Sequence, residues 1–133
     1  MKFSKISTVI IDDDPHALKH LHNLLSDDEE IEIVASCKNG KEAILKINKE
    51  NPDLIFLDIQ MPTINGFDVL NKIDSAIDTT VIFVTAYDEY AIKAFDVQAY
   101  DYLLKPFKDD RFYESLERAK KKIWFKNLTK NRD

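Results

Sequence analysis

The sequence predicts an α/β protein with a doubly wound parallel sheet, and two features of its hydrophobic pattern carry this prediction. Short apolar runs alternate along the chain with segments whose apolar residues recur at helical spacing. The short runs are apolar at nearly every position, which is typical of strands covered by helices on both faces. Right-handed crossovers between such strands favour one doubly wound sheet. The predicted strands are residues 7–11, 31–37, 54–57, 81–84 and 100–104.

A predicted helix follows each strand. Asp14 and Pro15 form a typical helix start, with Asp as the N-cap and Pro at the first helical position. Asn39 offers a second N-cap, with Glu42 three residues later as in a capping box. The third and fourth helices are expected over about residues 66–73 and 89–95, and the last begins near residue 109. The face of this last helix is apolar at Phe112, Leu116, Ala119 and Ile123.

Length and composition limit the classes of function. A chain of 133 residues fits one domain, and its net charge of −5 argues against broad nucleic-acid binding by this chain alone. The single cysteine, Cys37, excludes an internal disulfide and reads as a small buried apolar residue. No apolar run has the length of a membrane span, and the N-terminus lacks the pattern of a signal peptide. We therefore expect a cytoplasmic protein that does not enter a membrane.

Polar residues stand directly after four of the predicted strands. They are Asp12 and Asp13, then Asp58, Thr85 and Lys105. In doubly wound sheets, ligands bind beyond the carboxyl ends of the strands. If the strand order is 2-1-3-4-5, the first and third strands are neighbours and the three acids converge. Converging carboxylates repel one another unless a hard cation such as Mg²⁺ binds them.

A metal ion, a lysine and a hydroxyl group around one carboxylate suit phosphoryl transfer, which depends on positioning and on neutralisation of charge. Aspartate serves as the nucleophile in some of these reactions and forms an aspartyl-phosphate. The residues themselves therefore predict an aspartate that accepts a phosphoryl group beside a metal site.

Four segments, "IIDDDP", "LIFLDIQMPTINGFDVL", "VIFVTAYDE" and "AYDYLLKPF", resemble in order and spacing the receiver domain of two-component response regulators. The resemblance covers about residues 6–123. It implies the flavodoxin-like receiver fold, with five helices around a sheet of order 2-1-3-4-5. It also implies a receiver domain over residues 1–124, followed at 125–133 by a basic tail or the start of a linker to an absent output domain.

The resemblance implies a role for each residue of the acidic cluster. Asp58 matches the phosphoacceptor and a metal ligand. Asp13 matches the acid that coordinates Mg²⁺ (or Mn²⁺) directly, while Asp12 matches one that acts mainly through a metal-bound water. Gln60 occupies the position whose backbone carbonyl binds the metal.

The same resemblance implies roles outside the cluster. Thr85 matches the hydroxyl that turns toward the phosphoryl group, and Lys105 matches the lysine that contacts it. Tyr102 matches an aromatic residue that rotates when the threonine moves. The bond between Lys105 and Pro106 is expected to be cis. A histidine kinase is the expected phosphoryl donor.

The segment "YAIKAFDVQAYDYLLKPF" resembles the receivers of LytTR-type regulators, the LytR/AlgR class. This resemblance implies an all-β DNA-binding output domain, control of transcription, and no direct contact between the receiver and nucleic acid. The receiver's partners would be the kinase, the output domain and, through helix 4, strand 5 and helix 5, a second copy.

Three alternatives remain open. The first alternative is a stand-alone phosphorelay intermediate. The second is a pseudo-receiver that only binds proteins, and the intact set of acids, threonine and lysine argues against it. The third alternative is an Asp-nucleophile phosphohydrolase related to the haloacid dehalogenases. Those enzymes carry a second Asp two residues after the nucleophile, where this chain has Gln60. We therefore expect a signalling domain that assists only its own phosphorylation and dephosphorylation, not an enzyme.

In this family the residues two beyond the phosphoacceptor and two beyond the threonine tune hydrolysis of the phosphoryl group. These residues are Gln60 and Tyr87 here. Because a bulky tyrosine shields phosphorus from water, we predict a long-lived phosphorylated form that decays faster in Tyr87→Ala. The decay rate of the isolated phosphoprotein measures this effect, and an unchanged rate in the variant would refute the shielding role.

Overall fold

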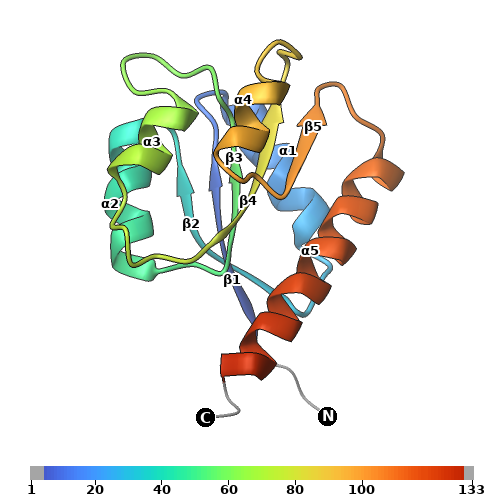
Figure 1. Cartoon of the computed structure of the whole chain (residues 1–133). Coiled ribbons are helices and arrows are strands. Elements are labelled where there is room, and N and C mark those ends of the chain that lie inside the picture. Colours follow the sequence, from blue (N-terminus) through green and yellow to red (C-terminus); the bar gives the residue numbers. More distant parts are fainter. Residues whose placement is uncertain (1–4, 131–133) are drawn as a thin grey trace.

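Five parallel strands form one sheet in the order β2-β1-β3-β4-β5, and the helices cover both of its faces (Figure 1). This computed structural model describes residues 5–130. The strands are β1 Ile6–Ile11, β2 Ile31–Cys37, β3 Leu54–Leu57, β4 Thr80–Thr85 and β5 Asp101–Leu104. The helices are α1 Pro15–Leu25, α2 Gly40–Glu50, α3 Gly66–Lys72, α4 Ala91–Asp96 and α5 Asp109–Lys130. The predicted doubly wound α/β fold and its strand order are confirmed.

The central strand β3 is apolar at every position because helices cover both of its faces. Its four side chains are all 0% exposed. Leu54 and Phe56 pack into the core under α1 and α5, whereas Ile55 and Leu57 pack into the core under α2, α3 and α4. Successive side chains of a strand point to opposite faces, so a strand covered on both sides needs apolar residues throughout.

Polar side chains fix where the helices begin. Asp14 accepts a hydrogen bond from the backbone N–H of His16 at 3.0 Å, as expected for the N-cap of α1. Asn39 caps α2 by accepting from the N–H of Glu42 at 2.8 Å. A full capping box forms at the start of α3, between Asn65 and Asp68. These caps place the loops that follow β1, β2 and β3.

Helix α4 begins at Ala91, slightly later than the sequence predicts. Its N-cap residue, Tyr90, makes no side-chain hydrogen bond to the helix. A short helix without a capping side chain depends on its surroundings for its position.

The apolar face predicted for the last helix is confirmed, because the side chains of Phe112, Leu116, Ala119 and Ile123 are all buried in the core on the α1 side. Helix α5 continues to Lys130, beyond residue 124. Residues 131–133 lie outside the described part of the chain, and the assignment of 125–133 as a tail or linker stays a prediction. Within residues 5–130, no helix combines the length and apolarity needed to cross a bilayer.

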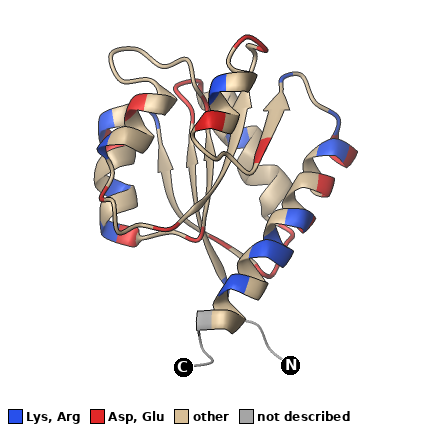
Figure 2. Ribbon diagram, viewed as in Figure 1, with Lys and Arg blue, Asp and Glu red and all other residues tan. Residues whose placement is uncertain are grey.

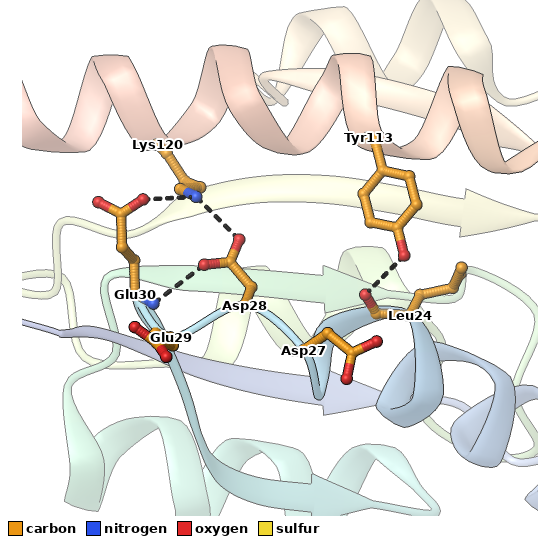
Figure 3. Close-up of a pocket in the computed structure, with 7 residues that line it drawn as sticks. All are labelled: Leu24, Asp27, Asp28, Glu29, Glu30, Tyr113 and Lys120. Atoms are coloured by element: carbon orange, nitrogen blue, oxygen red, sulfur yellow. Dashed lines mark hydrogen bonds and ion pairs between the residues drawn. The ribbon is translucent and has the colours of Figure 1, made fainter.

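Besides its buried apolar face, α5 is held by ion pairs in a surface pocket beside the loop between α1 and β2 (Figure 3). The Lys120 side chain is only 10% exposed, and its Nζ lies 2.8 Å from a carboxylate oxygen of both Asp28 and Glu30. Glu117 adds a third carboxylate at 3.2 Å. The acidic loop leads into β2, whose first residue pairs with the first residue of β1. This pocket is therefore at the amino edge of the sheet, opposite the predicted functional site.

We predict that Lys120→Ala lowers the free energy of unfolding by about 1–2 kcal/mol, because the largely buried ammonium group holds α5 to this loop. Lys121→Ala is the matched control, since Lys121 is exposed, and should change stability by less than about 0.5 kcal/mol. Urea unfolding of the two variants measures the difference. Equal losses in both would mean that the ion pairs of Lys120 contribute nothing specific.

Candidate functional site

Three carboxylates meet at the carboxyl edge of the sheet. Asp12 and Asp13 follow β1, and Asp58 follows β3, which pairs directly with β1. One carboxylate oxygen from each lies within 4.8 Å of the others. Asp12 is 1% exposed and Asp58 is 7% exposed, whereas Asp13 is exposed to solvent. The structure thus brings together the three acids that the sequence places at the strand ends, and we refer to them as the acidic site.

Each buried acid divides its two oxygens between different partners. Oδ1 of Asp58 accepts from the backbone N–H of Ile59 at 2.7 Å, and Oδ1 of Asp12 accepts from that of Asp14 at 2.9 Å. The two Oδ2 atoms share the ammonium group of Lys105, at 2.6 Å from Asp12 and 3.4 Å from Asp58. Charged hydrogen bonds of this kind keep buried carboxylates in defined orientations.

Lys105 reaches the acids from the loop after β5, and its bond to Pro106 is cis. Burial lowers the pKa of Lys105, but the hydrogen bond to Asp12 and the charge of Asp58 more than offset this, so the pKa lies above its ordinary value. The ammonium group is therefore charged at neutral pH and serves as the counter-ion of both carboxylates.

One lysine does not fully compensate two buried acids. Burial raises the pKa of Asp58, and the nearby charge of Asp12 adds to this effect. Lys105 and a hydrogen bond from Thr85 lower the pKa in the opposite direction, but the pKa remains above its ordinary value. With Asp13 added, the site holds an excess of negative charge. Oxygen donors this close together fit a hard divalent cation such as Mg²⁺ or Mn²⁺.

Gly66 allows α3 to begin against the backbone of Asp58. Its N–H donates to the carbonyl of Ile59 at 2.9 Å. A Cβ atom at this position would lie 2.5 Å from the Asp58 carbonyl oxygen, which is closer than a side chain can approach. The chain has only one other glycine, Gly40. The rarity of glycine was therefore a signal of a close backbone approach at Gly66, which the sequence analysis did not consider.

The other flank of the site is formed by β4 and β5. Thr85, the last residue of β4, is 0% exposed, and its Oγ1 accepts from the N–H of Tyr87 at 3.4 Å. The Tyr102 hydroxyl donates to the carbonyl oxygen of Tyr87, and the Tyr102 ring packs against Phe83 with its centroid at 6.3 Å. Tyr102 is thus tied to the backbone of the loop that follows Thr85. The Tyr87 residue is 43% exposed.

Gln60 contacts a residue that the sequence interpretation missed. Its Nε2 donates to the hydroxyl oxygen of Tyr90 at 2.8 Å, and the Tyr90 ring also meets the Tyr87 ring edge-on at 6.2 Å. The three-residue spacing of the tyrosines in "TAYDEY" was the available signal. It does not reveal a partner 30 positions earlier in the chain.

Cys37 plays no part in this site. It is 0% exposed at the end of β2, and burial raises the pKa of its thiol to about 12. A thiol that stays protonated is a poor nucleophile and a poor metal ligand. The interpretation of Cys37 as a buried apolar residue agrees with this position.

The fold and the site together are those of a receiver domain: a doubly wound sheet with acids, a threonine and a lysine at the carboxyl ends of its strands. The family model "Response regulator receiver domain" matches residues 8–117. The chain belongs to this family.

Named relatives agree with this assignment. An uncharacterized response regulatory protein of Shewanella oneidensis is 45% identical over 118 residues, which are 89% of this chain and 50% of the relative. Transcriptional regulatory protein BtsR of Salmonella typhi is 45% identical over 115 residues, or 86% of this chain and 48% of BtsR. The chain thus spans about half the length of the curated relatives it matches.

Solved structures show the same fold. The response regulatory domain of protein mrkE from Klebsiella pneumoniae superposes with a TM-score of 0.81 at 32% identity, covering 89% of this chain and 98% of that domain. The signal receiver domain of a putative Luxo repressor protein from Vibrio parahaemolyticus gives a TM-score of 0.85 at 28% identity, covering 94% and 97% of the two chains.

We predict that Asp58→Asn raises the free energy of unfolding at pH 7 by about 1 kcal/mol, because the amide removes a buried charge beside Asp12. A carboxyl group whose folded pKa exceeds its unfolded pKa favours folding at low pH, and this contribution is lost as the pH rises through the folded pKa. The advantage of the variant should therefore vanish below about pH 4.

Thermal unfolding of the wild type and the variant across this pH range measures the effect. Asp27→Asn is the control, because Asp27 is exposed and lies in the pocket at the amino edge of the sheet, away from the acidic site. An Asp58→Asn protein less stable than the wild type at pH 7 would show that Lys105 already compensates the charge in full.

Proposed function

We propose that this domain is the phosphoacceptor of a two-component signalling protein, with Asp58 as the residue that receives the phosphoryl group. One observation carries the proposal. The Asp58 carboxylate is held between a lysine, a threonine and two further acids, at the edge of the sheet where doubly wound folds bind ligands. This arrangement provides a nucleophile, counter-charges for phosphoryl oxygens and ligands for a metal ion.

The proposed reaction transfers a phosphoryl group from a phosphohistidine of a sensor kinase. A carboxylate oxygen of Asp58 attacks phosphorus, the P–N bond breaks, and the imidazole leaves with the electron pair. The carboxylates of Asp12, Asp13 and Asp58 and the backbone carbonyl of Gln60 would hold Mg²⁺ or Mn²⁺. When bound, this ion neutralises charge on the phosphoryl oxygens.

Two further side chains act on the product. The Lys105 ammonium group already lies 3.4 Å from Oδ2 of Asp58, so a small movement brings it to a phosphoryl oxygen. The Thr85 hydroxyl donates to a second phosphoryl oxygen. Because Thr85 Oγ1 accepts from the N–H of Tyr87, its movement changes the loop that also holds the Tyr102 hydroxyl. Phosphorylation thereby shifts the population of two arrangements of this loop.

The output surface in this proposal comprises α4, β5 and α5. Ile92 and Phe95 on α4 are 79% and 72% exposed, and Leu104 on β5 is 43% exposed. Exposed apolar residues that lie beside a conformational switch suit contact with a second copy or with an output domain. Relatives of about twice this length are transcriptional regulators by name, which supports transcription control as the output.

We propose further that the output is a LytTR-type DNA-binding domain and that the protein acts in the cytoplasm, as a signalling domain and not as an enzyme. The receiver itself would not contact nucleic acid. Figure 2 shows that the acidic residues of α5 lie in its first half and that its second half is basic. Lys120 in this basic half is already paired with Asp28 and Glu30, and the net charge of −5 opposes broad binding to phosphate backbones.

Incubation of the domain with acetyl phosphate and Mg²⁺ should add one phosphoryl group, detected by mass spectrometry of the intact protein. The adduct should disappear in Asp58→Ala and persist in Asp14→Ala, because Asp14 only caps α1. Chelation of the divalent ion should prevent the adduct from forming. A phosphoryl group that remains in Asp58→Ala would assign the reaction to another residue and refute the proposal.

A further inference from the structure

Tyr90 stands outside the set of residues that the proposed phosphoryl chemistry uses, yet it contacts that set. It is the N-cap residue of α4, but its side chain makes no hydrogen bond to the helix. Its hydroxyl oxygen instead accepts from Nε2 of Gln60 at 2.8 Å. We call this contact the Gln60–Tyr90 bridge. It joins the loop after β3 to the loop after β4.

These two loops flank the reactive carboxylate. Gln60 is two residues beyond Asp58, and Tyr90 is five residues beyond Thr85. The strands that carry Asp58 and Thr85 are neighbours in the sheet. The Gln60–Tyr90 bridge therefore closes the two loops on each other just beyond the ends of β3 and β4. The Asp58 side chain is 10% exposed, so even small loop movements change its access to solvent.

Aromatic contacts fix the Tyr90 ring independently of its hydroxyl group. Phe67 at the start of α3 is 3% exposed and meets the Tyr90 ring edge-on at 6.0 Å. Tyr87 meets the ring from the opposite end of the loop at 6.2 Å. Edge-to-face pairs at these distances are favourable. The ring should therefore keep its place when only the hydroxyl group is removed.

We propose that Tyr90 is a positioning residue that holds Gln60 across the β3–β4 side of the acidic site and so restricts the access of water to a phosphoryl group on Asp58. The inference rests on the proposed function, because it concerns the lifetime of the phosphorylated state. In the hydrolysis that it restricts, a water oxygen attacks phosphorus and the P–O bond to Asp58 breaks. The carboxylate leaves with the electron pair, and inorganic phosphate leaves as H2PO4⁻, which carries both protons of the water.

The sharpest test removes one oxygen atom. Tyr90→Phe deletes the hydroxyl group that accepts from Gln60 and keeps the ring contacts. The domain is phosphorylated with acetyl phosphate and Mg²⁺, the donor is removed, and the decay of the adduct is followed by mass spectrometry. Loss of one neutral hydrogen bond should speed the decay about two- to tenfold.

The double variant separates positioning from general loosening. Gln60→Ala removes the other half of the bridge, so Tyr90→Phe should have no further effect on decay when Gln60 is already alanine. Tyr113→Phe is the matched control, because it also deletes a tyrosine hydroxyl hydrogen bond, to the carbonyl of Leu24 at 3.0 Å, but near the amino-edge pocket (Figure 3). Its decay rate should equal that of the wild type.

Three results would overturn the inference: an unchanged decay rate in Tyr90→Phe, the same acceleration with and without Gln60, or an equal acceleration in Tyr113→Phe. An absence of any adduct on the wild-type domain is a different outcome, because it refutes the proposed function itself. The thermal midpoints of all variants are measured alongside, and an acceleration that follows lost stability would likewise count against a positioning role.

Discussion

The compensation of two adjacent buried carboxylates is the constraint on which the functional end of this molecule depends. Asp12 and Asp58 are almost fully buried at the ends of paired strands, where their charges repel each other. Isolated carboxylates in such places neutralise by a shift in pKa or destabilise the fold. Here one oxygen of each acid accepts a hydrogen bond from a backbone N–H, and the other oxygen lies against the ammonium group of Lys105. The remaining imbalance appears as the raised pKa of Asp58.

This compensation explains why the whole sheet is needed for a site of so few residues. Lys105 lies 93 positions after Asp12 and reaches it only because β5 follows β4, and β4 lies next to β3. The apolar strands hold these ends in register, and Gly66 lets α3 approach the Asp58 backbone. The amino edge is fastened separately, by Lys120 and the acidic loop before β2. Changes in charge at one edge therefore need not disturb the anchor at the other.

The contrast between Asp12 and Tyr90 shows what the sequence could predict. The fold and the acids follow from local patterns: largely apolar strands, Asp14 and Pro15 at a helix start, and polar residues directly after strand ends. These patterns predict where the acids lie, because the carboxyl ends of all the parallel strands meet at one edge of a doubly wound sheet. The Gln60–Tyr90 bridge has no such pattern. It joins the exposed Gln60 side chain to a half-buried tyrosine 30 positions later, and the direction of the Tyr90 ring depends on packing against Phe67 and Tyr87.

The same charges link metal binding to phosphorylation in the proposed function. Lys105 lies closer to Asp12 than to Asp58, at 2.6 Å against 3.4 Å. An ion held by Asp12 and Asp13 would replace the lysine as the counter-charge of Asp12. The ammonium group would then be released toward Asp58, where a phosphoryl group brings new negative charge. Each event lowers the free-energy cost of the other, and by linkage the coupling must be reciprocal. In the proposed function, one lysine shared by two acids would therefore couple metal binding to phosphorylation.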